Sequence, residues 1–124
     1  MKTKEHISLI GAGLSGPVMA SYLSSIGFST DVYESRSDMR TNSTSSAGRS
    51  INLALSARGI KALKDIGVYE KIRSTLIPMS GRMIHDENGN VQFQPYGQKK
   101  NEVIYSVSRS NLNKTLMDYA ETVS

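Results

Sequence analysis

Short apolar runs alternate with a helix-length amphipathic stretch through the first third of the chain. Residues 6–10 form an apolar run that suits a buried parallel strand, and residues 29–33 return to a strand-like pattern. Between them, the spacing predicts a helix that begins near Pro17 and ends at Gly27. One face of this helix is apolar and is expected to lie on a sheet. Its residues are Val18, Met19, Tyr22, Leu23 and Ile26.

Hydrophobic spacing predicts further elements in the rest of the chain. Residues 57–66 predict a helix, with Ser56 as its N-cap and Gly67 as its stop. The last helix has the clearest periodicity in the chain, and Ser110 can cap it. The remaining expected elements are a short strand or extended segment over 50–55, a short helix over 69–73, a hairpin over 81–96, a strand over 103–107 and this last helix over 110–123.

Three glycines follow the first strand at the spacing GxGxxG. Gly11 can make the tight turn, Gly13 can let the main chain approach a diphosphate, and Gly16 can let helix and strand pack closely. Pro17 suits the first turn of the helix, whose amino end favours an anion. Glu34 follows about 20 residues later, where an acid can bind both ribose hydroxyls but would repel a 2′-phosphate. The unit therefore predicts binding of FAD or NAD rather than NADP.

Residues 35–48 are polar and rich in turn-forming residues, so they predict a long loop. Loops of this length in compact domains are usually either functional or disordered. Arg36 and Arg40 lie in the loop and Arg49 follows it. The spacing alone leaves two interpretations open: three solvated arginines, or arginines that belong to a functional loop.

The predicted hairpin contains Asn-Gly, the strongest short signal for a hairpin turn. If Asn88 and Gly89 are the two loop residues, Arg82 lies opposite Pro95 and next to Tyr96. A guanidinium and a phenol at the open end of the hairpin can bind a carboxylate through charge-assisted hydrogen bonds. An exposed arginine beside a packed tyrosine is the alternative, because a slip of one residue changes the neighbours.

These patterns predict an α/β fold, in which a Rossmann-like β-α-β unit with a parallel sheet is joined to an antiparallel hairpin. No strand follows the last helix, although a crossover helix normally leads to another parallel strand. We therefore expect the chain to be the amino-terminal piece of a longer protein.

Composition excludes several classes of function. The net charge of +4 is spread along the chain rather than gathered on one face, which favours an anionic small ligand over nucleic acid. No apolar run is long enough to span a membrane. The chain has no cysteine, and His6 and His85 have no metal-binding spacing, so we expect no metal site. This composition is compatible with a reducing, cytosolic compartment.

Several motifs in a fixed order carry a resemblance to a known family. Behind GAGLSG and DVYESR come GRSINLALSARG over 48–59, PMSGRMIH over 78–85, PYG over 95–97 and SVSRSNLN over 106–113. The chain resembles the kynurenine 3-monooxygenase family of FAD-dependent aromatic hydroxylases over essentially its whole length. GAGLSG is shared with many flavoproteins, whereas GRSINLALS and the spaced PYG are specific to this family.

The resemblance implies an FAD enzyme that uses NADPH as co-substrate and O2 to hydroxylate L-kynurenine to 3-hydroxykynurenine through a C4a-hydroperoxyflavin. Such an oxidoreductase serves tryptophan catabolism by the kynurenine pathway and NAD biosynthesis. The chemistry is carried by the flavin, so no catalytic side chain is expected. Two alternatives are another FAD-dependent aromatic-acid hydroxylase and a non-catalytic dinucleotide-binding module.

The resemblance also implies roles for individual residues. Arg82 and Tyr96 would bind the kynurenine carboxylate, Ala54 would touch FAD through its main chain, and Arg109 would approach the ribityl and phosphate region. The residues expected at the adenosine and pyrophosphate end are Ser15, Tyr33, Glu34, Ser35 and Arg36. The chain departs from the family at two positions: Ser15, where an apolar residue is frequent, and Ala57, where histidine is common.

A division into two portions follows from the resemblance. Residues 1–78 and 103–124 would form the FAD-binding portion, and residues 79–102 would begin the substrate-binding portion. We expect this piece alone to be inactive, to bind FAD poorly and to make no membrane contact. The whole enzyme would be cytoplasmic in a bacterium, or held on the mitochondrial outer membrane of a eukaryote by an anchor beyond Ser124.

Overall fold

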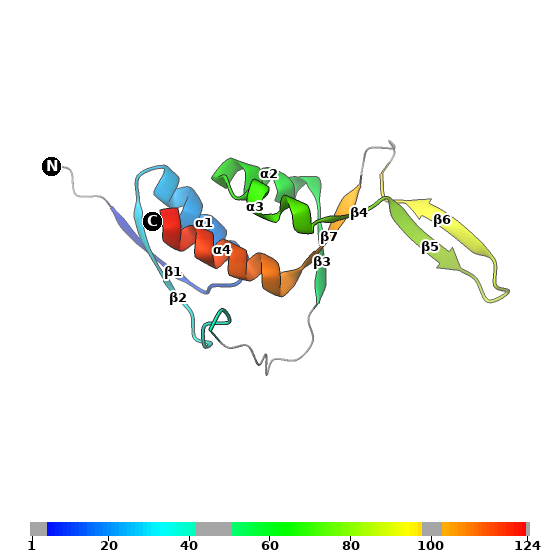
Figure 1. Ribbon diagram of the computed structural model, residues 1–124, viewed down its shortest axis with the longest axis horizontal. Helices are drawn as coiled ribbons and strands as arrows, with labels where there is room; N and C mark the ends of the chain where they lie inside the picture. Colours follow the sequence, from blue (N-terminus) through cyan, green and yellow to red (C-terminus); the bar gives the residue numbers. More distant parts are fainter. Residues whose placement is uncertain (1–4, 42–50, 98–102, 124) are drawn as a thin grey trace.

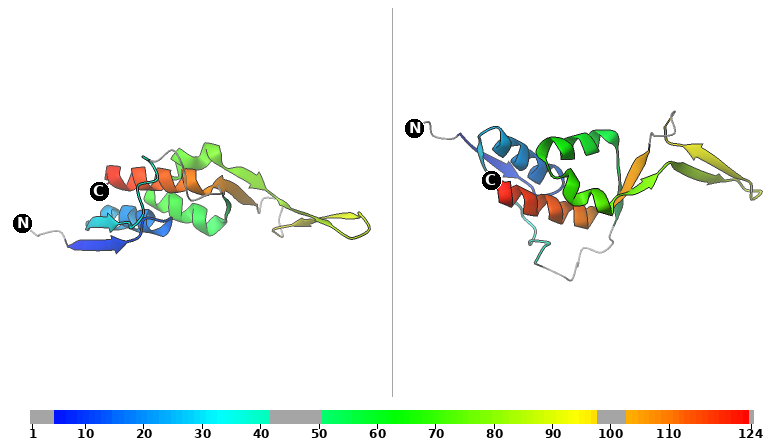
Figure 2. Two further views of the ribbon diagram at one scale, coloured as in Figure 1. Left: turned by 90° about the horizontal axis from the view of Figure 1, so that it is seen from below. Right: turned by 45° about the horizontal axis from the view of Figure 1, so that its top comes forward.

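The molecule is elongated, with a parallel two-stranded sheet at one end and a projecting hairpin at the other (Figure 1). The computed structural model describes residues 5–41, 51–97 and 103–123. Helices occupy the middle, and they lie on one side of the parallel sheet (Figure 2). Among the described residues, no helix is long and apolar enough to cross a membrane.

The parallel sheet and its crossover helix form the predicted β-α-β unit. Strand β1 (His6–Ile10) pairs in parallel with β2 (Ser29–Tyr33), and α1 (Ser15–Ser25) connects them. Gly27 follows α1 with a φ of +101°, a left-handed conformation that ends a helix at little cost in glycine. The α/β fold class predicted from the sequence is therefore confirmed.

The prediction of which face of α1 is buried is wrong in part. Met19, Tyr22 and Ile26 are exposed, whereas Ala20 and Ser21 are among the buried residues of this helix. Small residues face inward because α1 packs on both β2 and α4, and close helix packing favours small side chains. The prediction relied on the positions of large apolar side chains, and it therefore missed the face formed by small residues.

A second sheet lies between the helices and the hairpin (Figure 1). Its strands are antiparallel, in the order β3 (Asn52–Leu55), β7 (Ile104–Ser108) and β4 (Ile77–Met79). Strand β4 was not predicted, because Pro78 and its short length hide it. Pro78 pairs with Tyr105 at the edge of the sheet, where a missing N–H is tolerated.

Three further α-helices and one 3-10 helix lie among the described residues. Helix α2 (Ala57–Ile66) has the predicted bounds and ends at Gly67, whose φ is +89°. Ser56 occupies its N-cap position without a side-chain hydrogen bond. The predicted short helix is α3 (Tyr69–Ile72), which continues into the 3-10 helix η1 (Arg73–Thr75).

Helix α4 (Arg109–Val123) starts one residue earlier than predicted. The Asn111 N–H donates to Ser108 Oγ at 3.4 Å, so Ser108 rather than Ser110 accepts a hydrogen bond from the first turn. The inner face of α4 packs with α2, α3 and β7 in one apolar core. The buried core residues are Leu63, Ile66, Val68, Ile72, Val107, Leu112 and Leu116.

The hairpin consists of β5 (Gly81–His85) and β6 (Val91–Pro95), as predicted, but its register is different. Arg82 pairs with Gln94, not with Pro95. The Asp86 N–H donates to the Asn90 carbonyl at 3.0 Å, which leaves residues 87–89 as the loop. The Gly89 N–H donates to the Asp86 carbonyl at 3.1 Å, and Gly89 has a φ of +82°. A tight turn followed by a left-handed glycine is the usual form of a three-residue hairpin loop with a bulge.

The Asp86 side chain explains why this longer loop is preferred. Its carboxylate accepts hydrogen bonds from the Asn88 N–H at 2.9 Å, the Asn90 N–H at 2.7 Å and Asn90 Nδ2 at 2.9 Å. These bonds, led by the one from the Asn90 side chain, lower the pKa of Asp86. Local side-chain hydrogen bonding has therefore selected a turn that the Asn-Gly pair alone did not indicate.

The start of α1 and the glycine turn approach each other closely at Gly16. A Cβ built on this residue would overlap the Gly11 carbonyl oxygen, and the main chain of Gly11 is held in turn by its N–H, which donates to the Tyr33 carbonyl at 2.6 Å. Gly11 has a φ of +105°, which favours glycine. The predicted roles of Gly11 in the turn and of Gly16 in close packing are confirmed.

Replacing Gly16 with alanine should therefore destabilise the protein. We expect the free energy of unfolding to fall by about 1 to 3 kcal/mol, because the added methyl must displace main chain. Gly13→Ala is the matched control: a Cβ there meets nothing within 4 Å, so its effect should stay within about 0.5 kcal/mol. Urea unfolding of the two variants makes the comparison, and equal losses would contradict this account.

Candidate functional site

The carboxyl ends of β1 and β2 bring the glycine turn and Glu34 together. Glu34 Oε1 accepts a hydrogen bond from the Ala12 N–H at 3.2 Å, across 22 positions of sequence. Its side chain is 20% exposed, and its second oxygen accepts from the Arg36 N–H at 3.4 Å. The acid is thus held at the edge of the turn, where the ends of parallel strands commonly bind ligands.

Arg36 folds back onto the same carboxylate. Its Nη2 donates to Glu34 Oε1 at 3.1 Å and its Nε to Glu34 Oε2 at 3.3 Å. The hydrogen bonds from the Arg36 side chain, followed by that from the Ala12 N–H, lower the pKa of Glu34 to about 2. Glu34 is therefore ionised at neutral pH, and it is an acceptor that hydroxyl donors can share with Arg36.

A cleft of about 400 Å³ opens beside this pair. Its walls come from the glycine turn, α1, β2, the segment after β2 and α4. The lining residues that bear on binding are Ala12, Pro17, Glu34, Arg36, Arg40 and Met117. The lining also includes Asp31, Asp38 and Glu121, so four carboxylates and two arginines border this cleft. Its apolar walls and hydrogen-bond acceptors suit a ligand with an apolar ring and hydroxyl groups.

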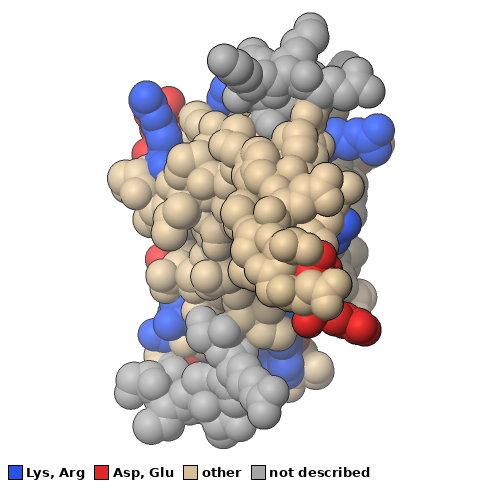
Figure 3. Space-filling model, turned by 90° about the vertical axis from the view of Figure 1, so that its right-hand side faces the viewer, with Lys and Arg blue, Asp and Glu red and all other residues tan. Residues whose placement is uncertain are grey.

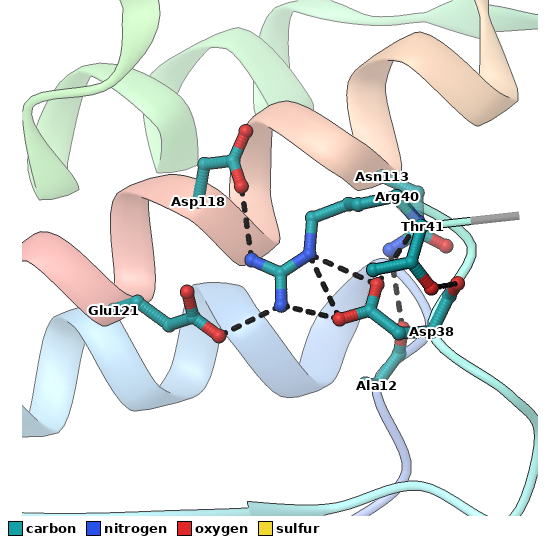
Figure 4. A network of polar contacts seen from close by, with 7 residues as sticks. All are labelled: Ala12, Asp38, Arg40, Thr41, Asn113, Asp118 and Glu121. Carbon is teal, nitrogen blue, oxygen red and sulfur yellow. Dashed lines mark hydrogen bonds and ion pairs between the residues drawn. The ribbon is translucent and has the colours of Figure 1, made fainter.

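Arg40 ties the segment after β2 to the distant helix α4 (Figure 4). It donates from Nη2 to Asp38 Oδ2 at 2.7 Å, from Nη1 to Asp118 Oδ1 at 2.9 Å and from Nη2 to Glu121 Oε1 at 2.7 Å. These bonds, led by that to Asp38, raise the pKa of Arg40, while Arg40 lowers the pKa of Asp38 to about 2. The interpretation of Arg40 as a solvated arginine is wrong, and Arg49 lies outside the described residues.

Asn113 is a second contact between α4 and the site. It is 4% exposed, and its Nδ2 donates to the Ala12 carbonyl at 3.1 Å and to the Gly13 carbonyl at 2.9 Å. The sequence analysis named Arg40 without indicating its partners on α4, and it missed Asn113. A polar residue within the apolar stripe of the last helix was the available signal for Asn113.

The other residues expected near the cofactor lie in two places, at the end of the β1–β2 unit and on the second sheet. Ser15 begins α1, and Tyr33 and Ser35 flank Glu34; all three are exposed. Ala54 lies on β3 opposite Ser106 of β7. The resemblance implied their roles at the cofactor, and their contacts with a cofactor stay predictions.

Arg109 starts α4, directly after β7. Its N–H donates to the Ile51 carbonyl at 3.0 Å, which joins the start of α4 to the chain before β3. Arg109 and Asn113 are four residues apart and therefore share a face of the helix. Because Asn113 contacts the glycine turn, this face of α4 is directed toward the same region as Gly13.

Arg82 and Tyr96 lie on the hairpin, at its end nearest β4 and away from the β1–β2 sheet (Figure 1). The Tyr96 N–H donates to the Ser80 carbonyl at 2.9 Å, so the register continues past β6. Alternate residues of a strand share a face, and Arg82, Gln94 and Tyr96 therefore lie on one face of the hairpin. Arg82 Nε donates to Gln94 Oε1 at 2.7 Å.

The hairpin end of the molecule has few charges. Figure 3 shows a mostly uncharged surface with lysine, arginine and acidic residues at its edges. Exposed apolar side chains on the hairpin include Met83, Val91 and Phe93. Gln94, opposite Arg82, was missed because the predicted register put Pro95 there.

Comparison with known proteins identifies a matching family, similar curated proteins and similar solved structures. Residues 9–75 match the model of a family described as NAD(P)-binding Rossmann-like domain. A protein named kynurenine 3-monooxygenase from Legionella pneumophila (strain Corby) is 46% identical over 117 residues, which are 94% of this chain and 26% of that protein. One of the same name from Anopheles gambiae is 45% identical, over 93% of this chain and 24% of that protein.

A solved structure gives the same picture of the fold. That of 2-methyl-3-hydroxypyridine-5-carboxylic acid oxygenase matches with a TM-score of 0.80 and 16% identity, over 99% of this chain and 30% of the other. At this identity the likeness concerns the fold alone. The chain spans about a quarter of the length of the curated relatives it matches.

The pKa of Glu34 predicts how stability depends on pH. Because the folded pKa is about 2 and the ordinary value is 4.5, the ionised carboxylate stabilises the folded state above about pH 5 and loses this effect as the pH falls toward 2. The difference in unfolding free energy between wild type and Glu34→Gln should therefore be constant near neutrality and shrink in acid. Urea titrations of both proteins between pH 2 and 7 would measure it. The titration of Asp38 contributes to both proteins, so it cancels in this difference. A difference in unfolding free energy that grew in acid would contradict the lowered pKa of Glu34.

Removing the Arg40 side chain should loosen the segment that carries Glu34 and Arg36. We expect Arg40→Ala to lower the free energy of unfolding by about 1 to 2 kcal/mol, because Asp38, Asp118 and Glu121 lose a common donor. Arg73→Ala is the matched control, since Arg73 meets Glu70 at 3.6 Å and both are exposed. Chemical unfolding of the two variants gives the comparison. Indistinguishable values would mean that the Arg40 cluster contributes no more than one surface pair.

Proposed function

This chain belongs to the NAD(P)-binding Rossmann-like domain family, and from that premise we propose that it forms the FAD-binding part of a monooxygenase that converts L-kynurenine to 3-hydroxykynurenine with NADPH and O2. The observation that carries the proposal is the ionised Glu34 carboxylate held against the glycine turn at the ends of β1 and β2. The names of the two relatives supply the substrate and the reaction.

The residues at the turn fit a dinucleotide. Gly13 has open space where a Cβ would stand, and Gly16 leaves the amino end of α1 close to the turn. Free N–H groups at a helix amino end favour a diphosphate. Glu34 can accept both ribose hydroxyls, and its charge disfavours a 2′-phosphate, so the site suits FAD better than NADPH.

Ten residues are proposed to hold FAD: Gly11, Gly13, Ser15, Gly16, Tyr33, Glu34, Ser35, Arg36, Ala54 and Arg109. The bound flavin would take electrons from NADPH and activate O2. The side chains of this chain position the cofactor and exclude water, and none of them takes part in the electron transfer.

The hairpin is proposed to bind the amino-acid end of the substrate. Arg82 and Tyr96 share a face, and the bond from Arg82 Nε to Gln94 leaves the terminal guanidinium nitrogens to donate to a carboxylate. Gln94 is uncharged, so it orients Arg82 without neutralising it. The corrected register supports the carboxylate contact better than the predicted one, which put Arg82 and Tyr96 on opposite faces.

Two portions of the chain would then have separate tasks. Residues 1–78 and 103–124 bind the cofactor, and residues 79–102 contribute to substrate binding. The reaction serves tryptophan catabolism by the kynurenine pathway and NAD biosynthesis. The enzyme would work in the cytoplasm of a bacterium or on the mitochondrial outer membrane of a eukaryote.

A chimera tests the proposal. This chain replaces the matching 117-residue stretch of the Legionella relative, and formation of 3-hydroxykynurenine is measured with NADPH, O2 and L-kynurenine. Arg82→Ala should raise KM for kynurenine about 30-fold with a smaller change in kcat, because a ground-state carboxylate contact is lost. Arg73→Ala, on an exposed helix, should leave both constants unchanged.

Three outcomes would contradict the proposal. Hydroxylation of other aromatic acids but not of kynurenine would assign the chain to a different hydroxylase. Binding of FAD without consumption of NADPH would indicate a non-catalytic dinucleotide-binding module. An unchanged KM in Arg82→Ala, with the chimera active, would remove the hairpin from substrate binding.

A further inference from the structure

Asn113 makes a contact that the proposed function does not use. It is a buried polar residue on α4, and it reaches across about a hundred positions of sequence to the glycine turn. Its amide nitrogen donates to two successive carbonyls, those of Ala12 at 3.1 Å and Gly13 at 2.9 Å. Both amide hydrogens are therefore committed to the main chain of the turn.

These two bonds set the direction of two peptide planes. In a trans peptide the C=O and the N–H that follow one another point in opposite directions, and no peptide in the described residues is cis. With the Ala12 and Gly13 carbonyls turned toward α4, the N–H groups of Gly13 and Leu14 must point away from it. Asn113 thus fixes the orientation of donors that it does not touch.

The orientation matters for an anion. N–H groups that point out of the turn attract a diphosphate, whereas a flipped peptide would present a carbonyl oxygen and repel it. Glycine at position 13 has no Cβ, so it can adopt more backbone conformations than any other residue, and the adjoining peptide can flip at lower cost. A restraint from outside the turn is therefore needed to hold one orientation.

We propose that Asn113 is a positioning residue for the diphosphate of the bound dinucleotide, acting through the Ala12 and Gly13 carbonyls. The inference rests on the proposed cofactor site and names the side chain that prepares it. Asparagine suits this task because it supplies two donors on one nitrogen. Leucine of similar size would leave two carbonyls without a partner, and aspartate would offer only acceptors when ionised.

The experiment separates diphosphate binding from binding of the nucleoside. The 124-residue chain is titrated with ADP and with adenosine, and both affinities are measured by NMR, which reports weak binding. Asn113→Leu should raise the Kd for ADP about tenfold and that for adenosine less than about twofold. Asn111→Leu is the matched control: it is the same change on the same helix at an exposed position, and it should alter neither Kd.

A measurement on the wild type keeps the test decisive if Asn113→Leu does not fold. The amide signals of Gly13 and Leu14 should shift with ADP but not with adenosine, because their N–H groups face the diphosphate. Signals that stay fixed while ADP binds would overturn the inference, as would equal Kd values for wild type and a folded Asn113→Leu. Weak binding is expected of this piece alone, but a complete failure of the wild type to bind either ADP or adenosine would instead refute the proposed cofactor site.

Discussion

The close approach of Gly16 to the Gly11 carbonyl is the contact on which the site depends. It brings the start of α1 against the end of β1, while the Gly11 N–H is bonded to the carbonyl at the end of β2. The ends of β1 and β2 and the start of α1 therefore meet at this turn, in addition to the pairing of the two strands along their length. Only in this arrangement does Glu34, one residue beyond β2, reach the Ala12 N–H. A side chain at position 16 would separate the parts before any ligand was involved.

Helix α4 supplies the second set of restraints. Its first half holds the glycine turn through Asn113, and its second half holds the segment after β2 through Arg40, Asp118 and Glu121. The proposed binding edge is thus fixed from three sides: by its own turn, by the neighbouring strand and by a helix about a hundred residues away. Such long-range contacts cost chain entropy, which the apolar core between α4, α2 and β7 offsets.

Local patterns predicted the elements well and the contacts between them less well. Gly27 and Gly67 end their helices as expected, because a left-handed residue after a helix is a local property. The inner face of α1 was missed because residues such as Ala20 carry little hydrophobic signal. The hairpin register was missed because Asp86 draws a longer loop around its carboxylate. Asn113 was missed because its partners adjoin it only in the folded chain.

The hairpin projects at the opposite end of the molecule from the β1–β2 sheet (Figure 1), and the extended shape of the proposed ligand allows this separation. A dinucleotide is long, so residues that bind its adenosine end and residues that bind a substrate at its other end need not be neighbours. Strand β7 joins the two regions: it pairs with β4, which leads to Arg82, and it runs into α4, which carries Asn113. Since Arg82 and Tyr96 lie at the end of the hairpin nearest β4, they occupy the part of it closest to this connection. The tip of the hairpin, with its bulged loop around Asp86, is the part farthest from this connection. A substrate bound at the tip would therefore not lie close to β7.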